Sequence, residues 1–117
     1  MTTNSVINFT EDRKGDVIVF RIKGRLDALS SPSVEKKIFE SINDGHEKIL
    51  IDLANVSYLS SAGMRMFLST TKKLRSLSGR LLVCGTTTSV LDVFKMSGFD
   101  HVLELFATEE EALRNVS

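Results

Sequence analysis

Apolar residues recur along this chain with the spacings of strands and of helices, and the changes between the two predict its elements. Residues 49–51 and 81–84 are continuously apolar, as in strands of a parallel sheet that are covered on both faces. In the segment from 16 to 23, Ile18, Phe20 and Ile22 share one face of an extended chain, and Val17, Val19, Arg21 and Lys23 share the other. This predicts a strand with one well-buried face and one mixed face. An earlier strand precedes it across a turn at Gly15, so these two are expected to form an antiparallel hairpin.

Four other segments carry apolar residues at helical spacing. In the first, apolar residues recur at every fourth position from 34 to 42, with Ser31 as the expected cap and Pro32 at the first helical position. The last follows the sequence TEEE at 108–111, which fits a capping box. The expected helices lie at about 32–43, 61–77, 87–97 and 109–116.

The order of these elements predicts one compact α/β domain over residues 1–117. The expected strands lie at about 6–11, 16–23, 48–53, 81–84 and 102–106. Helices between strands imply right-handed parallel crossovers, so we expect a mixed, mostly parallel sheet of about five strands with about four helices. Only the first hairpin is expected to be antiparallel. Residues 1–5 are expected to form a flexible N-terminus.

Composition narrows the class of protein. Fifteen basic residues balance fifteen acidic ones, so no net field attracts the chain to nucleic acid or to an anionic membrane. No apolar run approaches the roughly 20 residues of a membrane-spanning helix, and the first residues do not resemble a secretory signal. The single cysteine, Cys84, fits a reducing compartment. We therefore expect a cytoplasmic protein, and a monomer when it is free.

The sequence does not favour an enzyme. It contains no phosphate-binding loop, no dinucleotide-binding glycine motif and no nucleophile elbow. The two histidines, His46 and His101, are expected at the end of the sheet opposite Ser61, so a Ser61 nucleophile would lack a base. One cysteine and two scattered histidines predict no metal cluster and no cofactor.

The stretch 52–64 carries the candidate chemistry. A buried strand is expected to end in a turn at Asp52 and Asn55, and the chain then places Ser60 and Ser61 at the start of a helix, where a hydroxyl caps or a phosphate is held. Asp27 also follows a strand, so the carboxylates of Asp27 and Asp52 are expected at the edge of the sheet that carries Ser61. Two interpretations stay open: both aspartates cap turns, or they meet a kinase or the Mg²⁺ ion of a partner's active site.

Two motifs resemble those of a known family. Residues 52–64, DLANVSYLSSAGM, resemble the signature segment of STAS domains, the anti-sigma-factor-antagonist family. Residues 24–27, GRLD, are similar to that family's Gly-x-Leu-Asp motif, and the resemblance extends over essentially the whole chain. The family often has Asp before its phosphorylated serine and Ser or Thr before the glycine, where this chain has Ser60 and Ala62.

The resemblance implies a switch based on protein binding. In such antagonists an anti-sigma factor, itself an ATP-dependent serine kinase, phosphorylates a serine at the position of Ser61; Ser60 is the alternative acceptor. The unphosphorylated antagonist binds that kinase and frees a sigma factor, and a PP2C-type phosphatase restores it. The residues expected to contact the partner are Asp27, Asp52, Tyr58, Ser60, Ser61, Met64 and Arg65.

Three alternatives remain at this stage. The chain is a scaffold subunit of a stress-sensing complex, a standalone STAS partner of a membrane transporter, or an unrelated α/β module in which Ser61 only caps a helix. The short chain without an additional sensor domain favours the antagonist.

Overall fold

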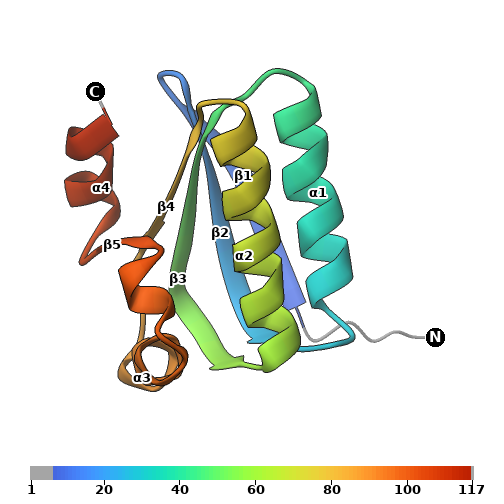
Figure 1. Cartoon of the computed structure of the whole chain (residues 1–117), viewed down its shortest axis with the longest axis vertical. Coiled ribbons are helices and arrows are strands. Elements are labelled where there is room, and N and C mark those ends of the chain that lie inside the picture. The colour runs from blue at the N-terminus through green and yellow to red at the C-terminus, as the bar shows by residue number, and fades with distance from the viewer. Residues whose placement is uncertain (1–6, 117) are drawn as a thin grey trace.

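Five strands form one sheet in the computed structural model, which describes residues 7–116. The strands are β1 (Ile7–Lys14), β2 (Val17–Leu26), β3 (Lys48–Leu59), β4 (Arg80–Cys84) and β5 (Glu104–Phe106). Their order in the sheet is their order in the chain; β1 runs antiparallel to β2 and the others are parallel (Figure 1). This confirms the mixed sheet expected from the sequence. The flexible terminus expected at 1–5 lies outside the described residues.

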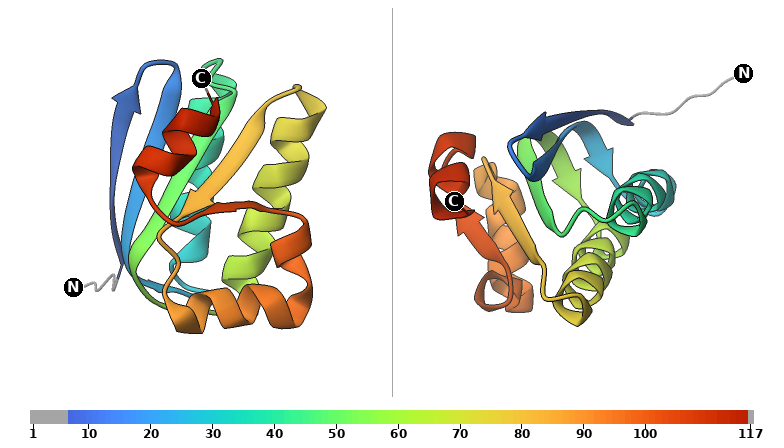
Figure 2. Two further views of the ribbon diagram at one scale, coloured as in Figure 1. Left: turned by 90° about the vertical axis from the view of Figure 1, so that its left-hand side faces the viewer. Right: turned by 90° about the horizontal axis from the view of Figure 1, so that it is seen from above.

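The helices cover the two faces of the sheet unequally. They are α1 (Ser31–Asn43), α2 (Ser61–Ser76), α3 (Thr88–Ser97), the 3₁₀ turn η1 (Phe99–His101) and α4 (Glu109–Val116). Helices α1 and α2 lie side by side on one face, and the short α4 lies on the other (Figures 1 and 2). Helix α3 crosses the end of the sheet at which β2 and β3 finish. No helix within residues 7–116 is long and apolar enough to cross a membrane.

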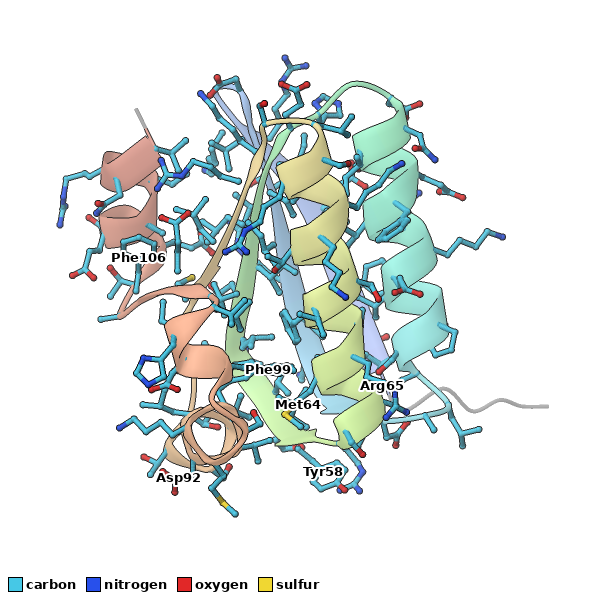
Figure 3. All side chains as sticks on the ribbon, in the orientation of Figure 1. Tyr58, Met64, Arg65, Asp92, Phe99 and Phe106 are labelled. Atoms are coloured by element: carbon cyan, nitrogen blue, oxygen red, sulfur yellow. The ribbon has the colours of Figure 1, made fainter. Side chains whose placement is uncertain are left out.

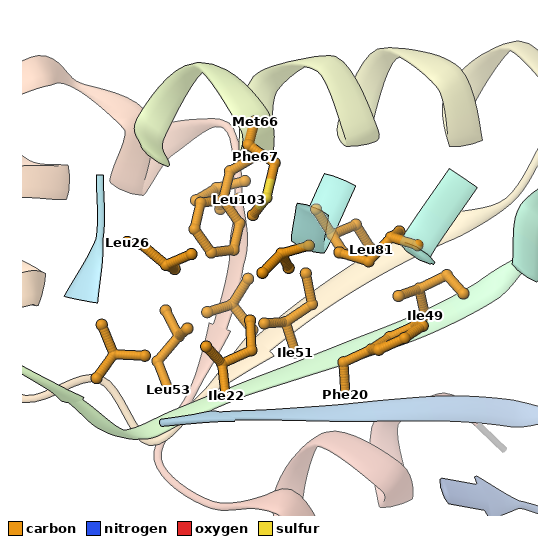
Figure 4. Close-up of a cluster of buried hydrophobic side chains, with 14 of the residues drawn as sticks. Phe20, Ile22, Leu26, Ile49, Ile51, Leu53, Met66, Phe67, Leu81 and Leu103 are labelled. Carbon is orange, nitrogen blue, oxygen red and sulfur yellow. The ribbon is translucent and has the colours of Figure 1, made fainter. Parts of the chain in front are cut away.

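Each face of the sheet has its own core. The larger core lies under α1, α2 and α3, and Figure 4 shows part of it. In this core Phe67 packs edge-on against Phe94 with ring centroids 5.5 Å apart. The smaller core lies under α4. Neighbouring residues of β3 serve different cores, because Ile51 belongs to the larger and Leu50 to the smaller. This is why the strand is continuously apolar. Burial raises the pKa of the Cys84 thiol, which lies in the smaller core, to about 12.

The expected turn at Asp52 and Asn55 is wrong. Strand β3 continues to Leu59 and stays paired with β2, whose own end at Leu26 lies opposite Leu59. Two irregularities in the pairing, between 21 and 23 and between 24 and 25 of β2, absorb the change of register. The polar residues therefore lie on a bulged strand and do not end it.

The start of α1 also differs from the expectation. Ser30, not Ser31, is the residue before the helix, and its side chain makes no capping bond to the helix. Ser31 is the first helical residue, with Pro32 behind it. The hydroxyl of Ser30 is used elsewhere, because it donates to the carbonyl of Arg25 at 2.6 Å and closes the loop between β2 and α1.

Candidate functional site

The two sequence motifs meet at the start of α2. The backbone N–H of Ser60 donates to the carbonyl of Leu26 at 2.8 Å, which ties the end of β3 to the end of β2. A Cβ on Gly63 would approach that same carbonyl to 2.9 Å and the side chain of Leu59 to 2.6 Å. Only a glycine therefore lets the first turn of α2 lie this close to the sheet. The two motifs therefore pack against each other at Leu26, which is fully buried, and Gly63, which is also buried.

The two serines at this helix start have different roles. Ser60 is the N-cap, with an extended backbone and a side-chain oxygen that accepts from the N–H of Gly63 at 3.3 Å. Ser61 is the first helical residue and is exposed, and its hydroxyl has no hydrogen-bond partner among residues 7–116. It lies at the positive end of a 16-residue helix. The hydroxyl that is available to another molecule is therefore that of Ser61.

Asp27 closes the loop that leads into α1. One of its carboxylate oxygens accepts from the N–H groups of Ser30 at 3.1 Å and Leu29 at 3.0 Å. These bonds, that of Ser30 first, hold the pKa of Asp27 below its usual value. Its other oxygen lies 4.0 Å from the guanidinium of Arg25. Asp27 thus acts as a cap of this turn, one of the two interpretations that the sequence left open.

Exposed side chains surround the start of α2. The guanidinium of Arg25 lies 4.2 Å from the centre of the Tyr58 ring, a cation–π contact, and Tyr58 is 42% exposed. On α2 itself, Met64 is half-buried against the larger core, whereas Arg65 is exposed on the side of α1 (Figure 3). Leu29, in the loop before α1, is 89% exposed. The exposed groups at this end of the molecule are therefore apolar, aromatic and positively charged.

Asp52 does not belong to this surface, which corrects the expectation from the sequence. Since β3 continues for seven residues after it, Asp52 lies roughly 20 Å before the start of α2. Its side chain lies on the α4 face, next to Glu109, and one of its oxygens accepts from the N–H of Ala54 at 2.9 Å. Burial and then the neighbouring Glu109 raise the pKa of Asp52. Asp27 and Asp52 therefore do not flank Ser61 together.

Asp52 belongs instead to a charged cluster that the sequence did not indicate. Arg21 of β2 donates two hydrogen bonds to Glu109 at the start of α4, at 2.6 and 2.8 Å, and a third to Asp12 of β1 at 3.3 Å. The Arg21 guanidinium is the main cause of the lowered pKa of Glu109. Asp12, Arg21, Asp52 and Glu109 are hereafter called the α4 cluster. Within residues 7–116, no group of three or more acidic, histidine or cysteine side chains is placed to hold a metal ion.

Comparison with known proteins assigns the family. The sequence model of the STAS domain matches residues 8–112, so the chain belongs to the STAS domain family. The anti-sigma-B factor antagonist of Staphylococcus aureus is 27% identical over 96 residues, which cover 82% of this chain and 86% of that relative.

Solved structures agree with this assignment. An anti-sigma factor antagonist from Mycobacterium paratuberculosis has a TM-score of 0.86 at 25% identity, with 94% of this chain and 93% of that chain covered. The phosphorylated form of the Bacillus cell fate determinant SpoIIAA has a TM-score of 0.75 at 26% identity, with 94% and 100% covered. These similarities confirm the family and the fold that the two motifs indicated.

Proposed function

We propose that this chain is an anti-sigma factor antagonist, a protein-binding module that phosphorylation of Ser61 switches off. The observation that carries the proposal is that the hydroxyls of the two serines have different roles. Ser60 uses its hydroxyl to cap α2, whereas Ser61 is exposed at the same helix start and its hydroxyl makes no hydrogen bond to the part of the chain that the structure describes. The relative from Staphylococcus aureus is named as an antagonist, and the similar structure of SpoIIAA is a phosphorylated form, which supports the choice.

In this mechanism the partner is an anti-sigma factor with serine kinase activity. The unmodified surface binds that partner, and a sigma factor is released. During transfer the Ser61 oxygen attacks the γ-phosphorus of ATP held by the partner, the bond to ADP breaks, and the hydroxyl proton passes to a base of the partner. A PP2C-type phosphatase hydrolyses the phosphate ester and restores the binding form.

The phosphate acts on the interface and not on the fold. It adds about −1.5 to −2 charges at a helix N-terminus, where the helix dipole favours negative charge. A dianion in the contact surface must be desolvated on binding, and about 2.7 kcal/mol is enough to weaken a complex a hundredfold. The residues that we assign to the partner surface are Asp27, Tyr58, Ser60, Ser61, Met64 and Arg65. Asp52 is left out because it lies half-buried beside α4.

Phosphosite mapping by mass spectrometry, on protein recovered from its own cells, tests the proposal. Phosphate is expected on Ser61 and is expected to disappear in Ser61→Ala. The matched control is Ser60→Ala, which should keep the phosphate on Ser61 although loss of the cap destabilises the protein by about 1 kcal/mol. Phosphate on Ser60 would move the acceptor by one residue. Its absence from both serines, in growth and in stress, would contradict the switch and favour a scaffold or transporter-partner role.

A further inference from the structure

A groove runs between the first turns of α1 and α2, beside Ser61. Its volume is about 410 Å³. Helix α1 and the loop before it contribute Ala28, Ser31, Pro32 and Glu35, and helix α2 contributes Ala62, Arg65, Met66 and Ser69. Ser31 is only 4% exposed, and its hydroxyl is buried without a hydrogen-bond partner among the described residues. The groove therefore contains polar groups whose hydrogen-bonding capacity the folded chain leaves unused.

Arg65 is the cation of this groove, and no carboxylate neutralises it. Within residues 7–116 no acidic oxygen lies within 4.0 Å of its guanidinium, although Glu35 lines the same groove from α1. The other arginine near the helix start, Arg25, is already engaged with the Tyr58 ring and lies 4.0 Å from Asp27. Of these two arginines, Arg65 is the one whose charge is unused.

The geometry of a helix brings Arg65 to Ser61. The two residues are four apart on α2, and such residues are neighbours on the helix surface, about 5–6 Å apart at their Cβ atoms. Long side chains on a helix lean toward its N-terminus, so the guanidinium of Arg65 is directed over the turn that holds Ser61. Figure 3 places Arg65 at this amino-terminal end of α2.

We propose that Arg65 is the phosphate-positioning residue of this switch: once Ser61 is phosphorylated, its phosphate forms an intrahelical ion pair with Arg65 at the mouth of the groove. The inference rests on the proposed function and adds the internal partner of the modification. A phosphate dianion outcompetes Glu35, because it carries more charge and lies at the positive end of the helix. Phosphorylation then removes two features from the binding surface at once, the Ser61 hydroxyl and the free charge of Arg65.

The test installs phosphoserine at position 61 during translation, so that no kinase is needed. The ³¹P shift is titrated with pH in the otherwise wild-type protein and in Arg65→Gln. Phosphoserine has a second pKa of about 6, and a nearby cation lowers it by favouring the dianion. Arg65→Gln is expected to raise this pKa by about 0.15–0.4 unit, the size of an i,i+4 ion pair for the one charge that this ionisation adds.

Two further variants make the result specific. Lys72→Gln removes the same charge from an exposed position of α2 that lies about 16 Å from Ser61 along the helix axis. This is beyond the roughly 8 Å screening length of physiological salt, so the variant should leave the pKa of the phosphate unchanged. Arg65→Lys keeps the positive charge, so the pKa of the phosphate should lie between those of the wild type and Arg65→Gln. Equal pKa values in wild type and Arg65→Gln would overturn the ion pair even where mapping finds phosphate on Ser61. A shift in Arg65→Gln without phosphate on Ser61 in cells would overturn the proposed function alone.

Discussion

The start of α2 and the α4 cluster use charged and polar side chains in opposite ways. At the start of α2, Ser61 and Arg65 are exposed and have no bonded partner among the described residues. In the α4 cluster the charges are paired within the chain, through bonds of Arg21 to Glu109 at 2.6 and 2.8 Å. The motif at 52–64 contributes to both regions, because its first residue, Asp52, lies in the α4 cluster and Ser61 is exposed at the start of α2. Membership of a motif therefore does not place a residue at the binding site.

The α4 cluster has a clear structural purpose. Helix α4 has only eight residues, too few to be stable alone in water. It is held by the apolar contacts of Ala112 and Val116 and by the two-pronged bond between Arg21 and Glu109. An ion pair that is fully exposed to water would add little to the free energy of unfolding. The side chain of Glu109 is only 21% exposed, however, so its hydrogen bonds to Arg21 are partly shielded from water.

Replacing Gly63 with alanine should have the largest effect on the start of α2. The new Cβ would lie 2.9 Å from the Leu26 carbonyl and 2.6 Å from Leu59, so the first turn must move away from the sheet. We expect a loss of about 2–3 kcal/mol of unfolding free energy, measured by urea denaturation. The sign of this change in unfolding free energy is diagnostic, because replacing glycine with alanine within a helix normally stabilises a protein by about 0.5–1 kcal/mol. A stabilised Gly63→Ala protein would refute the close approach of the two motifs.

Replacing Arg21 with methionine should have a smaller effect, confined to the other face. The change removes the hydrogen bonds to Glu109 and Asp12 and the positive charge that Arg21 places beside the Glu109 and Asp52 carboxyls. We expect a loss of about 1.5–2 kcal/mol, with faster hydrogen exchange in α4 than in α2.

The matched control for this change is Arg13→Met. Within residues 7–116 the Arg13 guanidinium donates only to the carbonyl of Gly15 on the exposed hairpin turn, so Arg13→Met should change the unfolding free energy by no more than about 0.5 kcal/mol. If Arg21→Met costs no more than Arg13→Met, then the apolar contacts alone hold α4. The ion pairs of the α4 cluster would then contribute nothing measurable to the attachment of α4.

Much of this architecture was predictable from local pattern. The continuous apolar runs at 49–51 and 81–84 gave buried strands because both faces of the sheet are covered. The apolar face formed by 18, 20 and 22 and the mixed face opposite it marked a strand with two unequal faces. The cap of the last helix was also predictable, since the N–H of Glu111 donates to the Thr108 hydroxyl at 3.1 Å. Each of these features depends on residues that lie close together in the sequence.

What the sequence missed depends on distant partners. The turn expected at Asp52 failed because β3 stays paired with β2 through a bulged register. The Asp52 side chain lies beside Glu109 of α4, 57 residues later in the chain. The roles of Ser60 and Ser61 were left open because either residue can cap a helix; only the exact start of α2 assigns the cap to Ser60. Secondary-structure propensity depends on a residue and its neighbours in the sequence. The extent of β3 and the choice of the capping serine depended instead on which strand or helix packs against these residues.

The smallest expected effect concerns Asp52 and depends on pH. Because the pKa of Asp52 is raised in the folded protein, the folded state holds its proton at pH values where the unfolded chain has lost it, so the carboxyl lowers stability as pH rises above its usual pKa of 3.8. Asp52→Asn removes this cost and keeps an oxygen for the N–H of Ala54. The variant should match wild type near pH 3 and exceed it at pH 7–8, by less than about 1 kcal/mol because water screens a half-exposed group. Thermal unfolding across this range measures the difference, and a less stable variant at pH 8 would mean that the Asp52 carboxylate is paired with Arg21 instead.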